Sequence, residues 1–340
     1  MKKHIYIYSP SGAVRDKAAF RRGVARLKAL GHEVEIDEAA LASHLRFAGD
    51  DETRLAAIHR AAASGADVAL ISRGGYGLTR ILGGIHYKKV AKAIEKGTQF
   101  VGISDFTAFQ SAVLARTGGV TWAGPALCEG FGVGGKPDMT DGHGYGEEPV
   151  PDDIMEACFD DLVQGQGEGS GWRQNRELPL CAIHSIAKTS TNTGAVATFG
   201  IKNAILWGGN LSVLTSLLGT PYFPSVKGGI LFLEDVGEHP YRIERMLTQL
   251  LHAGVLGRQK ALLMGQFTEY KLFPHDRGYK LQSVVNWLRQ QIKIPVLTNL
   301  PYGHVATKVL LPVGATTDLM VEGRDALLFW GDNPANRDMT

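Results

Sequence analysis

Hydrophobic residues in the first 125 positions of the chain follow two alternating periods. Short apolar runs predict strands at 5–8, 32–36, 66–72 and 100–104. Between these runs the apolar residues recur at helical spacing, over roughly 14–30 and on the face that carries Leu55, Ile58 and Ala62. This alternation of strand and helix predicts a parallel sheet with helices on both faces.

The segment VGISDFTAFQSAVLARTG at 101–118 changes from the period of a strand to that of a helix. Ser104 and Asp105 interrupt the apolar run, after which Phe106, Phe109 and Val113 recur at helical spacing. Ser104 could be an N-cap residue whose hydroxyl accepts hydrogen bonds from backbone N–H groups. It could also be a nucleophile exposed on a sharp strand-to-helix turn. The GxSxG motif of α/β-hydrolases is not met, because Phe106 stands at its last position.

Two loops follow neighbouring predicted strands, SRGGYG at 72–77 and SDFT at 104–107. Ligands of parallel sheets bind beyond the carboxyl ends of the strands, so we expect both loops to border one crevice. The glycines of RGGYG (73–77) allow backbone N–H groups to approach a bound anion. The loop matches no phosphate-binding motif; it could be an oxyanion cradle or a tight turn without a ligand.

The second half of the chain has a weaker and then a renewed pattern. Residues 130–195 are rich in Gly, Pro and acidic residues and predict a linker or lid around one helix near 152–163. Further strands are predicted at 204–210, 228–237, 261–267 and 294–298, and helices at 239–254 and 279–291. Two late runs, KVLLPVGATTDLMV and ALLFW, predict an antiparallel or barrel-like end to the fold.

Length and composition are those of a two-domain globular protein. The 340 residues are 44% hydrophobic and 21% charged, and Lys and Arg exceed Asp and Glu by 36 to 34, which gives no support for a nucleic-acid partner. Cys128, Cys158 and Cys181 are odd in number and show no CxxC spacing, so we expect neither disulfides nor a metal site. The apolar run after MKK ends at Ser9 and is too short for a signal peptide, and no run is long enough to span a membrane. We therefore expect a cytoplasmic protein.

Three further residues could carry chemistry together with Ser104. Glu234 and Asp235 end the apolar strand GGILFLED, where a carboxylate must be paired or hydrogen-bonded. His304 follows a predicted strand in LPYGH, and a single histidine can be structural as well as catalytic. Ser104, His304 and Glu234 would together supply a nucleophile, a base and an orienting acid.

Six sequence blocks resemble the bacterial murein tetrapeptide LD-carboxypeptidases, a family of serine peptidases, and they occur in the family's order across most of the chain. The blocks are RFAGDDETRL, SRGGYGLTRIL, GISDFTAFQ, LWGGNLSVLTSLLGTPYFP, ILFLEDVGEHPYRIERMLTQLLHAG and LPYGH. The resemblance implies that Ser104 is the nucleophile, Glu234 the charge-relay acid and His304 the base. It also implies that the backbone N–H groups of Gly75 and Asp105 form the oxyanion hole.

The implied reaction is hydrolysis of the bond between the L-centre of meso-diaminopimelate and a terminal D-alanine in muropeptides, during cytoplasmic cell-wall recycling. Arg73, Arg80 and Arg242 are candidates for binding the free carboxylate of the substrate. One alternative is the related microcin-immunity hydrolase, which cleaves a peptidyl-nucleotide amide and for which Trp172 could supply a purine platform. Another alternative is a catalytically inactive binding module.

The resemblance also implies the fold class. We expect an α/β protein with a flavodoxin-like or glutamine-amidotransferase-like parallel sheet at 1–130. A linker or lid at 131–190 would join it to a second β/α domain at 191–340 with a barrel-like sheet. The expected partner is a muropeptide, with no cofactor, no nucleic acid and no membrane, and the chain is expected to form a homodimer.

Overall fold

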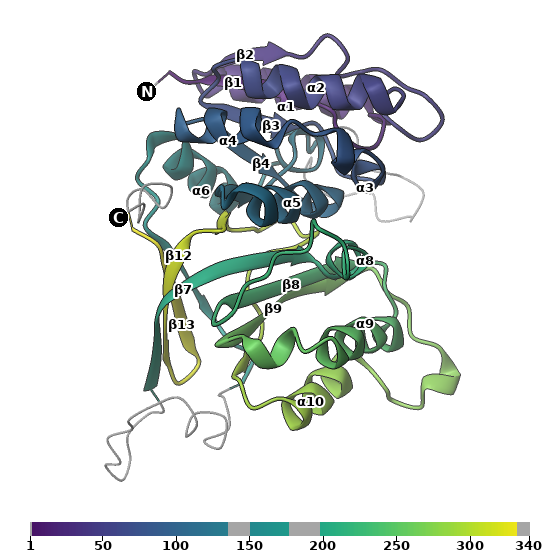
Figure 1. Cartoon of the computed structure of the whole chain (residues 1–340), viewed down its shortest axis with the longest axis vertical. Helices are drawn as coiled ribbons and strands as arrows, with labels where there is room; N and C mark the ends of the chain where they lie inside the picture. Colours follow the sequence, from purple (N-terminus) through teal and green to yellow (C-terminus); the bar gives the residue numbers. More distant parts are fainter. Residues whose placement is uncertain (1, 135–149, 177–197, 332–340) are drawn as a thin grey trace.

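The computed structural model describes residues 2–134, 150–176 and 198–331, which form two stacked lobes (Figure 1). The first lobe contains a six-stranded sheet in the order β11-β5-β4-β3-β1-β2. Its strands are β1 (His4–Tyr8), β2 (Glu33–Ile36), β3 (Val68–Ile71), β4 (Gln99–Gly102), β5 (Thr121–Ala123) and β11 (Leu311–Val313). All neighbouring strands are parallel except β11, which is antiparallel to β5. The predicted parallel sheet is therefore confirmed.

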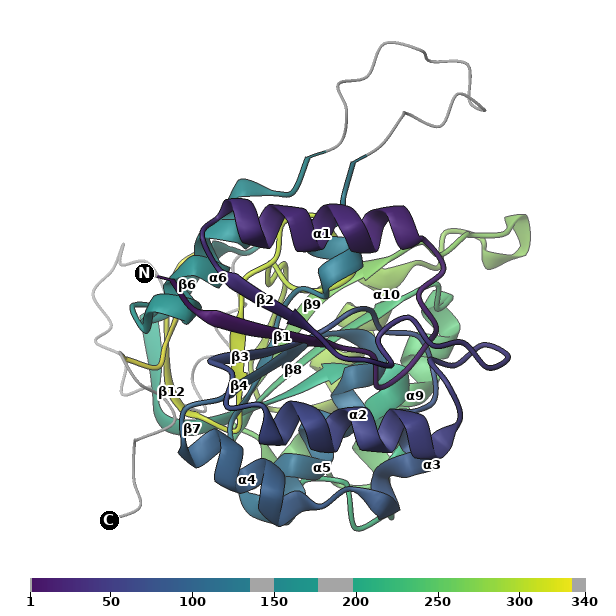
Figure 2. The ribbon, with the colours of Figure 1, turned by 90° about the horizontal axis from the view of Figure 1, so that it is seen from above.

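Helices cover both faces of this sheet, as predicted. Figure 2 shows α1 on one side of the strands and α2 and α4 on the other. The helices of the first lobe are α1 (Lys17–Ala29), α2 (Asp51–Ala63), α3 (Leu78–Ile81), α4 (Tyr87–Glu95), α5 (Thr107–Thr117) and α6 (Asp153–Gln164). Side-chain caps explain where several begin: Asp16 accepts from two N–H groups of α1, and Asp50 accepts from Thr53 N–H at 2.8 Å in α2. The helix predicted near 152–163 is α6.

The second lobe contains a seven-stranded sheet in the order β10-β9-β8-β7-β12-β13-β6. Its strands are β6 (Gly169–Arg173), β7 (Thr198–Asn210), β8 (Ile230–Val236), β9 (Ala261–Thr268), β10 (Val296–Leu297), β12 (Thr316–Glu322) and β13 (Asp325–Phe329). Strands β7 to β10 are parallel, whereas β12, β13 and β6 continue from β7 as an antiparallel ribbon. Its helices are α8 (Leu211–Ser216), α9 (Pro240–His252) and α10 (Leu281–Gln291).

The predicted barrel-like sheet is not found. The strand order of the second sheet has two ends, and within the described residues β10 pairs only with β9 and β6 only with β13. The long strand β7 bends from the parallel half into the antiparallel ribbon, as Figure 1 shows. Alternation of apolar and polar residues in the late strands is the same in an open sheet and in a closed one, which is why the sequence could not separate them.

Two strands pair with a sheet outside the domain in which the sequence placed them. Strand β6 comes from the predicted linker 131–190, yet it pairs with β13 of the second sheet. Strand β11 comes from the predicted second domain, yet it pairs with β5 of the first. The chain therefore passes between the two lobes more than once. The predicted domain boundaries at residues 130 and 190 remain a prediction.

The interior of the molecule consists of two apolar cores. The larger core fills the first lobe and extends into the antiparallel ribbon, and the smaller one lies between β7–β9 and the helices α8, α9 and α10. Ile243, Leu247 and Leu250 of α9 are fully buried in the smaller core, and Met246 packs against it partly buried. Within the described residues no helix combines the length and the apolar composition needed to cross a membrane.

Candidate active site

Ser104 lies on a strained turn between β4 and α5. The strand ends at Gly102, and a single 3-10 turn, η2 (Ser104–Phe106), leads into the helix. Ser104 has a backbone φ of +67°, a left-handed conformation that is unfavourable for residues with a Cβ. The N-cap hypothesis is not supported, because neither η2 nor α5 has a side-chain cap and Ser104 Oγ has no hydrogen bond within the described residues. Strain at an uncapped serine is typical of functional turns.

The RGGYG loop packs directly against this turn. A Cβ added to Gly74 would lie 2.6 Å from Ser104 Cβ, so only glycine fits there. Gly75 has a φ of +120° and faces Gly12, whose N–H donates to Gly74 O at 3.2 Å. Within residues 2–134, 150–176 and 198–331 the Gly75 N–H has no acceptor. The two predicted loops therefore meet at one edge of the sheet, as expected.

The Asp105 side chain connects the Ser104 turn to the neighbouring loops. Its buried carboxylate accepts from Ser11 Oγ and from the Leu78 N–H at 2.9 Å. Burial raises the pKa of Asp105, although these hydrogen bonds and the charge of Arg54 oppose the shift. Arg54, also fully buried, donates to Gly77 O at 2.8 Å. The glycine loop is thus held from both sides, which fixes the orientation of its N–H groups relative to Ser104.

Glu234 and His304 form a hydrogen-bonded pair at the end of the second sheet. His304 Nδ1 lies 2.8 Å from Oε2 of Glu234, which is fully buried near the end of β8. Burial would lower the pKa of His304, but the hydrogen bond and charge of Glu234, with the charges of Asp235 and Glu129, outweigh it and raise that pKa. The other Glu234 oxygen accepts from Asn210 Nδ2 at 3.1 Å. Both carboxylate oxygens therefore have donors.

Asp235 has a different environment from its neighbour. It accepts from the Ser212 N–H at 2.8 Å, at the start of α8, and from Asn210 Nδ2 at 3.0 Å. Burial, followed by the charge of Glu234, raises the pKa of Asp235 to about 6. Of the two adjacent carboxylates it is Glu234 that contacts His304, and Asp235 anchors the turn that positions Asn210.

The two lobes meet beside the Ser104 turn. Thr107, the first residue of α5, accepts a hydrogen bond from the Asn210 N–H at 3.0 Å. A Cβ on Gly209 would lie 2.5 Å from Thr107 Oγ1, so the glycine permits this close approach. Asn210 therefore contacts the helix that follows Ser104 as well as Glu234, and this links the serine of one lobe to the carboxylate of the other.

Ser104 and His304 line the same pocket, which has a volume of about 610 Å³. Gly74 and Gly75 form part of its wall. The pocket is rich in charged side chains that come from both lobes: Arg15, Arg46, Arg73, Glu129, Glu269 and Lys308. Such a pocket suits a substrate that carries several charges of its own.

Of the three arginines predicted to bind a carboxylate, only Arg73 lines this pocket. Its guanidinium lies 3.6 Å from Glu129 and donates to Ala13 O at 3.3 Å. Arg80 instead pairs with Asp51 at 2.9 Å, beside a separate hollow. Arg242, on α9, pairs with Glu238, which precedes the helix, at 2.6 Å. The sequence showed no pattern that would have selected Arg15, Arg46 or Lys308 instead.

Trp172 does not line the pocket. It lies in β6, is 9% exposed, and donates from Nε1 to Thr298 O at 3.1 Å.

Cys128 and Cys158 are free thiols, and burial raises the pKa of Cys128 to about 12, which makes it a poor nucleophile. Cys181 lies outside the described residues. No group of three or more metal-ligating side chains occurs in the described part of the chain.

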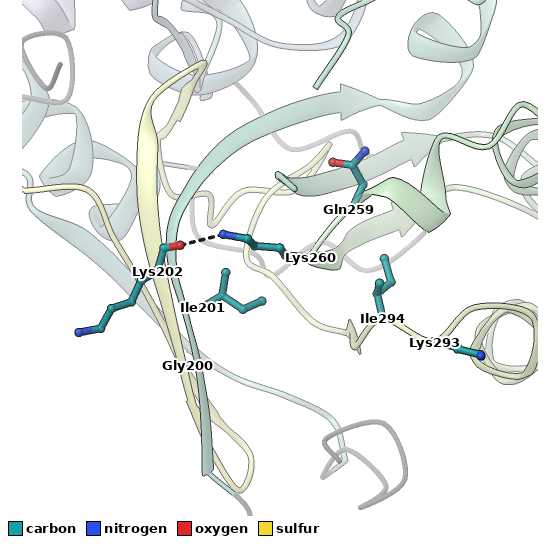
Figure 3. Close-up of a pocket in the computed structure, with 7 residues that line it drawn as sticks. All are labelled: Gly200, Ile201, Lys202, Gln259, Lys260, Lys293 and Ile294. Carbon is teal, nitrogen blue, oxygen red and sulfur yellow. Dashed lines mark hydrogen bonds between the residues drawn. The ribbon is translucent and has the colours of Figure 1, made fainter. Parts of the chain in front are cut away.

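A second cavity, of about 530 Å³, lies where β9 and β10 begin, at the end of the second sheet opposite to Glu234 (Figure 3). Lysines and isoleucines dominate its lining, but Lys260 Nζ already donates to Lys202 O at 3.0 Å. Gln259 is likewise bound, to Trp207 Nε1 at 3.0 Å. No residue of the serine, histidine and carboxylate group contributes to this cavity.

Models of one peptidase class match both halves of the chain. The LD-carboxypeptidase N-terminal domain matches residues 5–124 and the LD-carboxypeptidase C-terminal domain matches residues 203–319. The chain belongs to the LD-carboxypeptidase family, and it is a carboxypeptidase.

Relatives support the same assignment. A "Probable murein peptide carboxypeptidase" of Bacillus subtilis (strain 168) is 28% identical over 313 residues, which cover 89% of this chain and 84% of the relative. The crystal structure of a muramoyltetrapeptide carboxypeptidase from Oxalobacter formigenes has a TM-score of 0.78 at 35% identity and covers 97% of this chain and 99% of that one. The microcin C7 self-immunity protein MccF shares the fold, with a TM-score of 0.75 at 20% identity over 96% of each chain.

Proposed function

We propose that this carboxypeptidase hydrolyses the bond between the L-centre of meso-diaminopimelate and the terminal D-alanine of murein tetrapeptides. The observation that carries the proposal is the convergence of Ser104, His304 and the His304-bound Glu234 on one charged pocket between two lobes. The names of the relatives point to murein peptides as the substrate class.

The proposed mechanism follows from the tautomer that Glu234 selects. When His304 donates its Nδ1–H to Glu234, Nε2 is left as the free base. Nε2 accepts the Ser104 proton while Oγ attacks the carbonyl carbon, and it then gives the proton to the nitrogen of the departing D-alanine. A water molecule next attacks the acyl-enzyme, loses its proton to His304 and releases the shortened peptide, while the proton returns to Ser104.

The oxyanion of the tetrahedral intermediate would be held by the N–H groups of Gly75 and Asp105. The absence of an acceptor for the Gly75 N–H within the described residues supports this assignment. One such donor is typically worth about 10²–10³ in rate. The contacts of Asp105 and Arg54 with the loop then serve to keep the donors in place before the substrate binds.

The microcin-immunity alternative is less well supported by this pocket. Trp172, the predicted purine platform, is buried elsewhere, in β6. The described residues that line the pocket include no Phe, Tyr or Trp, whereas a purine is commonly bound by stacking on an aromatic ring. The lining instead includes four cationic side chains, which suits a peptide with several carboxylates.

The test compares D-alanine release from three peptides at equal concentration: the murein tetrapeptide, the pentapeptide that ends in D-Ala-D-Ala, and an all-L tetrapeptide. We expect rapid release from the first and little from the others, because inverting the acyl-side centre moves the carbonyl away from the fixed donors, and a displacement near 1 Å can cost about 10²-fold. Comparable rates on tetrapeptide and pentapeptide would contradict the proposal. Cleavage of an aminoacyl-nucleotide amide without activity on any peptide would favour the immunity-type reaction.

We also propose that the enzyme acts in the cytoplasm as a homodimer. Sedimentation equilibrium at micromolar concentration should give twice the mass of the chain, which is 36.7 kDa. A constant monomer mass would exclude the dimer but would leave the proposed reaction unaffected.

A further inference from the structure

Lys308 differs from the other three cations of the pocket because it is buried. Its side chain lines the pocket with Ser104 and His304, yet the residue is only 3% exposed. Within the described residues its ammonium forms no hydrogen bond and no ion pair within 4 Å. A lysine that is almost wholly buried and whose ammonium has no partner is unfavourable, so its presence at this position requires an explanation.

The nearby carboxylates do not supply the missing partner. Burial lowers the pKa of Lys308, and the charges of Glu129, Asp152 and Glu234 only partly oppose that shift. Each of these acids already has another partner. Glu234 accepts from His304, Glu129 faces Arg73, and Asp152 caps α6 while it accepts from Thr307 Oγ1 at 2.6 Å.

The backbone on both sides of Lys308 is held in place. Thr307 is fixed by Asp152, and the Val309 N–H donates to Pro301 O at 2.8 Å. The chain then enters β11 and joins the first sheet. Lys308 is therefore positioned in advance, which lowers the entropic cost of binding a ligand.

We propose that Lys308 binds the terminal carboxylate of the D-residue that leaves, an inference that rests on the proposed function. His304 must hand its proton to the nitrogen of that residue, and the carboxylate carbon is only two bonds from this nitrogen. The cation that recognises the carboxylate must therefore lie close to the imidazole. Lys308 is four residues from His304 on the same segment and lines the same pocket.

The arginines of the pocket fit this role less well. Arg73 already faces Glu129 and donates to Ala13 O. Arg15 and Arg46 come from loops of the first lobe, on the side of the serine and not of the imidazole. These arginines are placed to bind carboxylates of the remaining, acyl part of the peptide.

The experiment measures kcat/KM of wild type and Lys308→Met on two substrates: the murein tetrapeptide and the same peptide with a C-terminal D-alanine amide. On the free acid we expect a loss of roughly 10- to 150-fold, the usual cost of removing a hydrogen bond to a charged group. On the amide we expect kcat/KM to stay within about threefold of wild type, because no carboxylate is present to be recognised. Lys227→Met, at an exposed loop lysine, serves as the matched control and should leave both rates unchanged.

The ratio of acid to amide rates separates recognition from a structural role. An equal loss on both substrates, or no loss on either, would overturn the assignment of Lys308. The thermal midpoint of Lys308→Met should equal or exceed that of wild type, since an unpaired buried charge is removed. Wild type that released no D-alanine from the free acid would instead refute the proposed function itself.

Discussion

Replacing Glu234 by Gln tests the proposed relay at the atom where it acts. Both Glu234 oxygens are used, one by His304 Nδ1 at 2.8 Å and one by Asn210 Nδ2 at 3.1 Å. A glutamine offers one oxygen and one NH₂ group, so only one of these two donors can keep its acceptor. The residue is fully buried, and bulk water cannot replace the lost oxygen. If the oxygen stays with Asn210, the NH₂ group faces Nδ1 and forces the proton onto Nε2.

An imidazole protonated at Nε2 cannot accept the Ser104 proton. The corresponding acid-to-amide change in a serine protease triad lowers kcat by about 10⁴-fold, which is about 5.4 kcal/mol of transition-state stabilisation. We expect a loss of this size in kcat on the tetrapeptide, with D-alanine release followed by a D-amino-acid oxidase assay. The matched control is Glu238→Gln, four residues further on, whose carboxylate pairs with Arg242. Activity of Glu234→Gln within tenfold of wild type, with loss in Glu238→Gln, would refute the relay.

Four further predictions concern the same site. Because Ser104 has a φ of +67°, Ser104→Gly should be more stable than Ser104→Ala by about 1 kcal/mol, and both should lack activity; denaturant unfolding that shows the alanine variant to be the more stable would contradict the strain. Because His304 must be neutral to act as a base and its pKa is raised above 6.5, kcat/KM should fall tenfold per pH unit on the acid side, with a midpoint above 6.5. Because its pKa is higher in the folded state, protonated His304 also contributes to the free energy of unfolding below pH 6.5, and this contribution is lost as the pH rises through the folded pKa. A contribution from His304 that increased with pH would contradict the raised pKa. Prolonged dialysis against a strong chelator should leave D-alanine release unchanged, and recovery of a lost activity by added zinc would refute a serine mechanism.

Local patterns in the sequence predicted most of what surrounds the candidate site. The buried runs before Ser104 and Glu234 were recognisable as strands, and residues at the carboxyl ends of parallel strands must share an edge. Glu234 and His304 were grouped by their residue types and by family resemblance, but no local pattern predicts the contact between them, since seventy positions separate them in the chain. Nothing local indicates that Asn210 bridges Glu234 and Asp235, because that contact depends on the register of β7 against β8.

The features that the sequence did not reveal depend on distant partners. Strand β6, GSGWR, lacks the β-branched residues typical of strands and is defined by its pairing with β13. Strand β11 has only three residues, so no periodicity can assign it to the first sheet. Lys308 reads as an ordinary surface lysine in sequence, and its burial follows from the path of the chain between the two lobes.

The pairing of β11 with β5 also governs how the chain is completed during synthesis. At about 5–20 residues per second, roughly 10–40 s pass between the emergence of β5 and that of β11. For that interval the edge of β5 has no strand to cover it, and an uncovered edge can pair with another chain. His304 and Lys308 arrive only just before β11. The nascent chain thus carries its proposed nucleophile long before its proposed base, and the proposed triad can form only when the chain has emerged almost to β11.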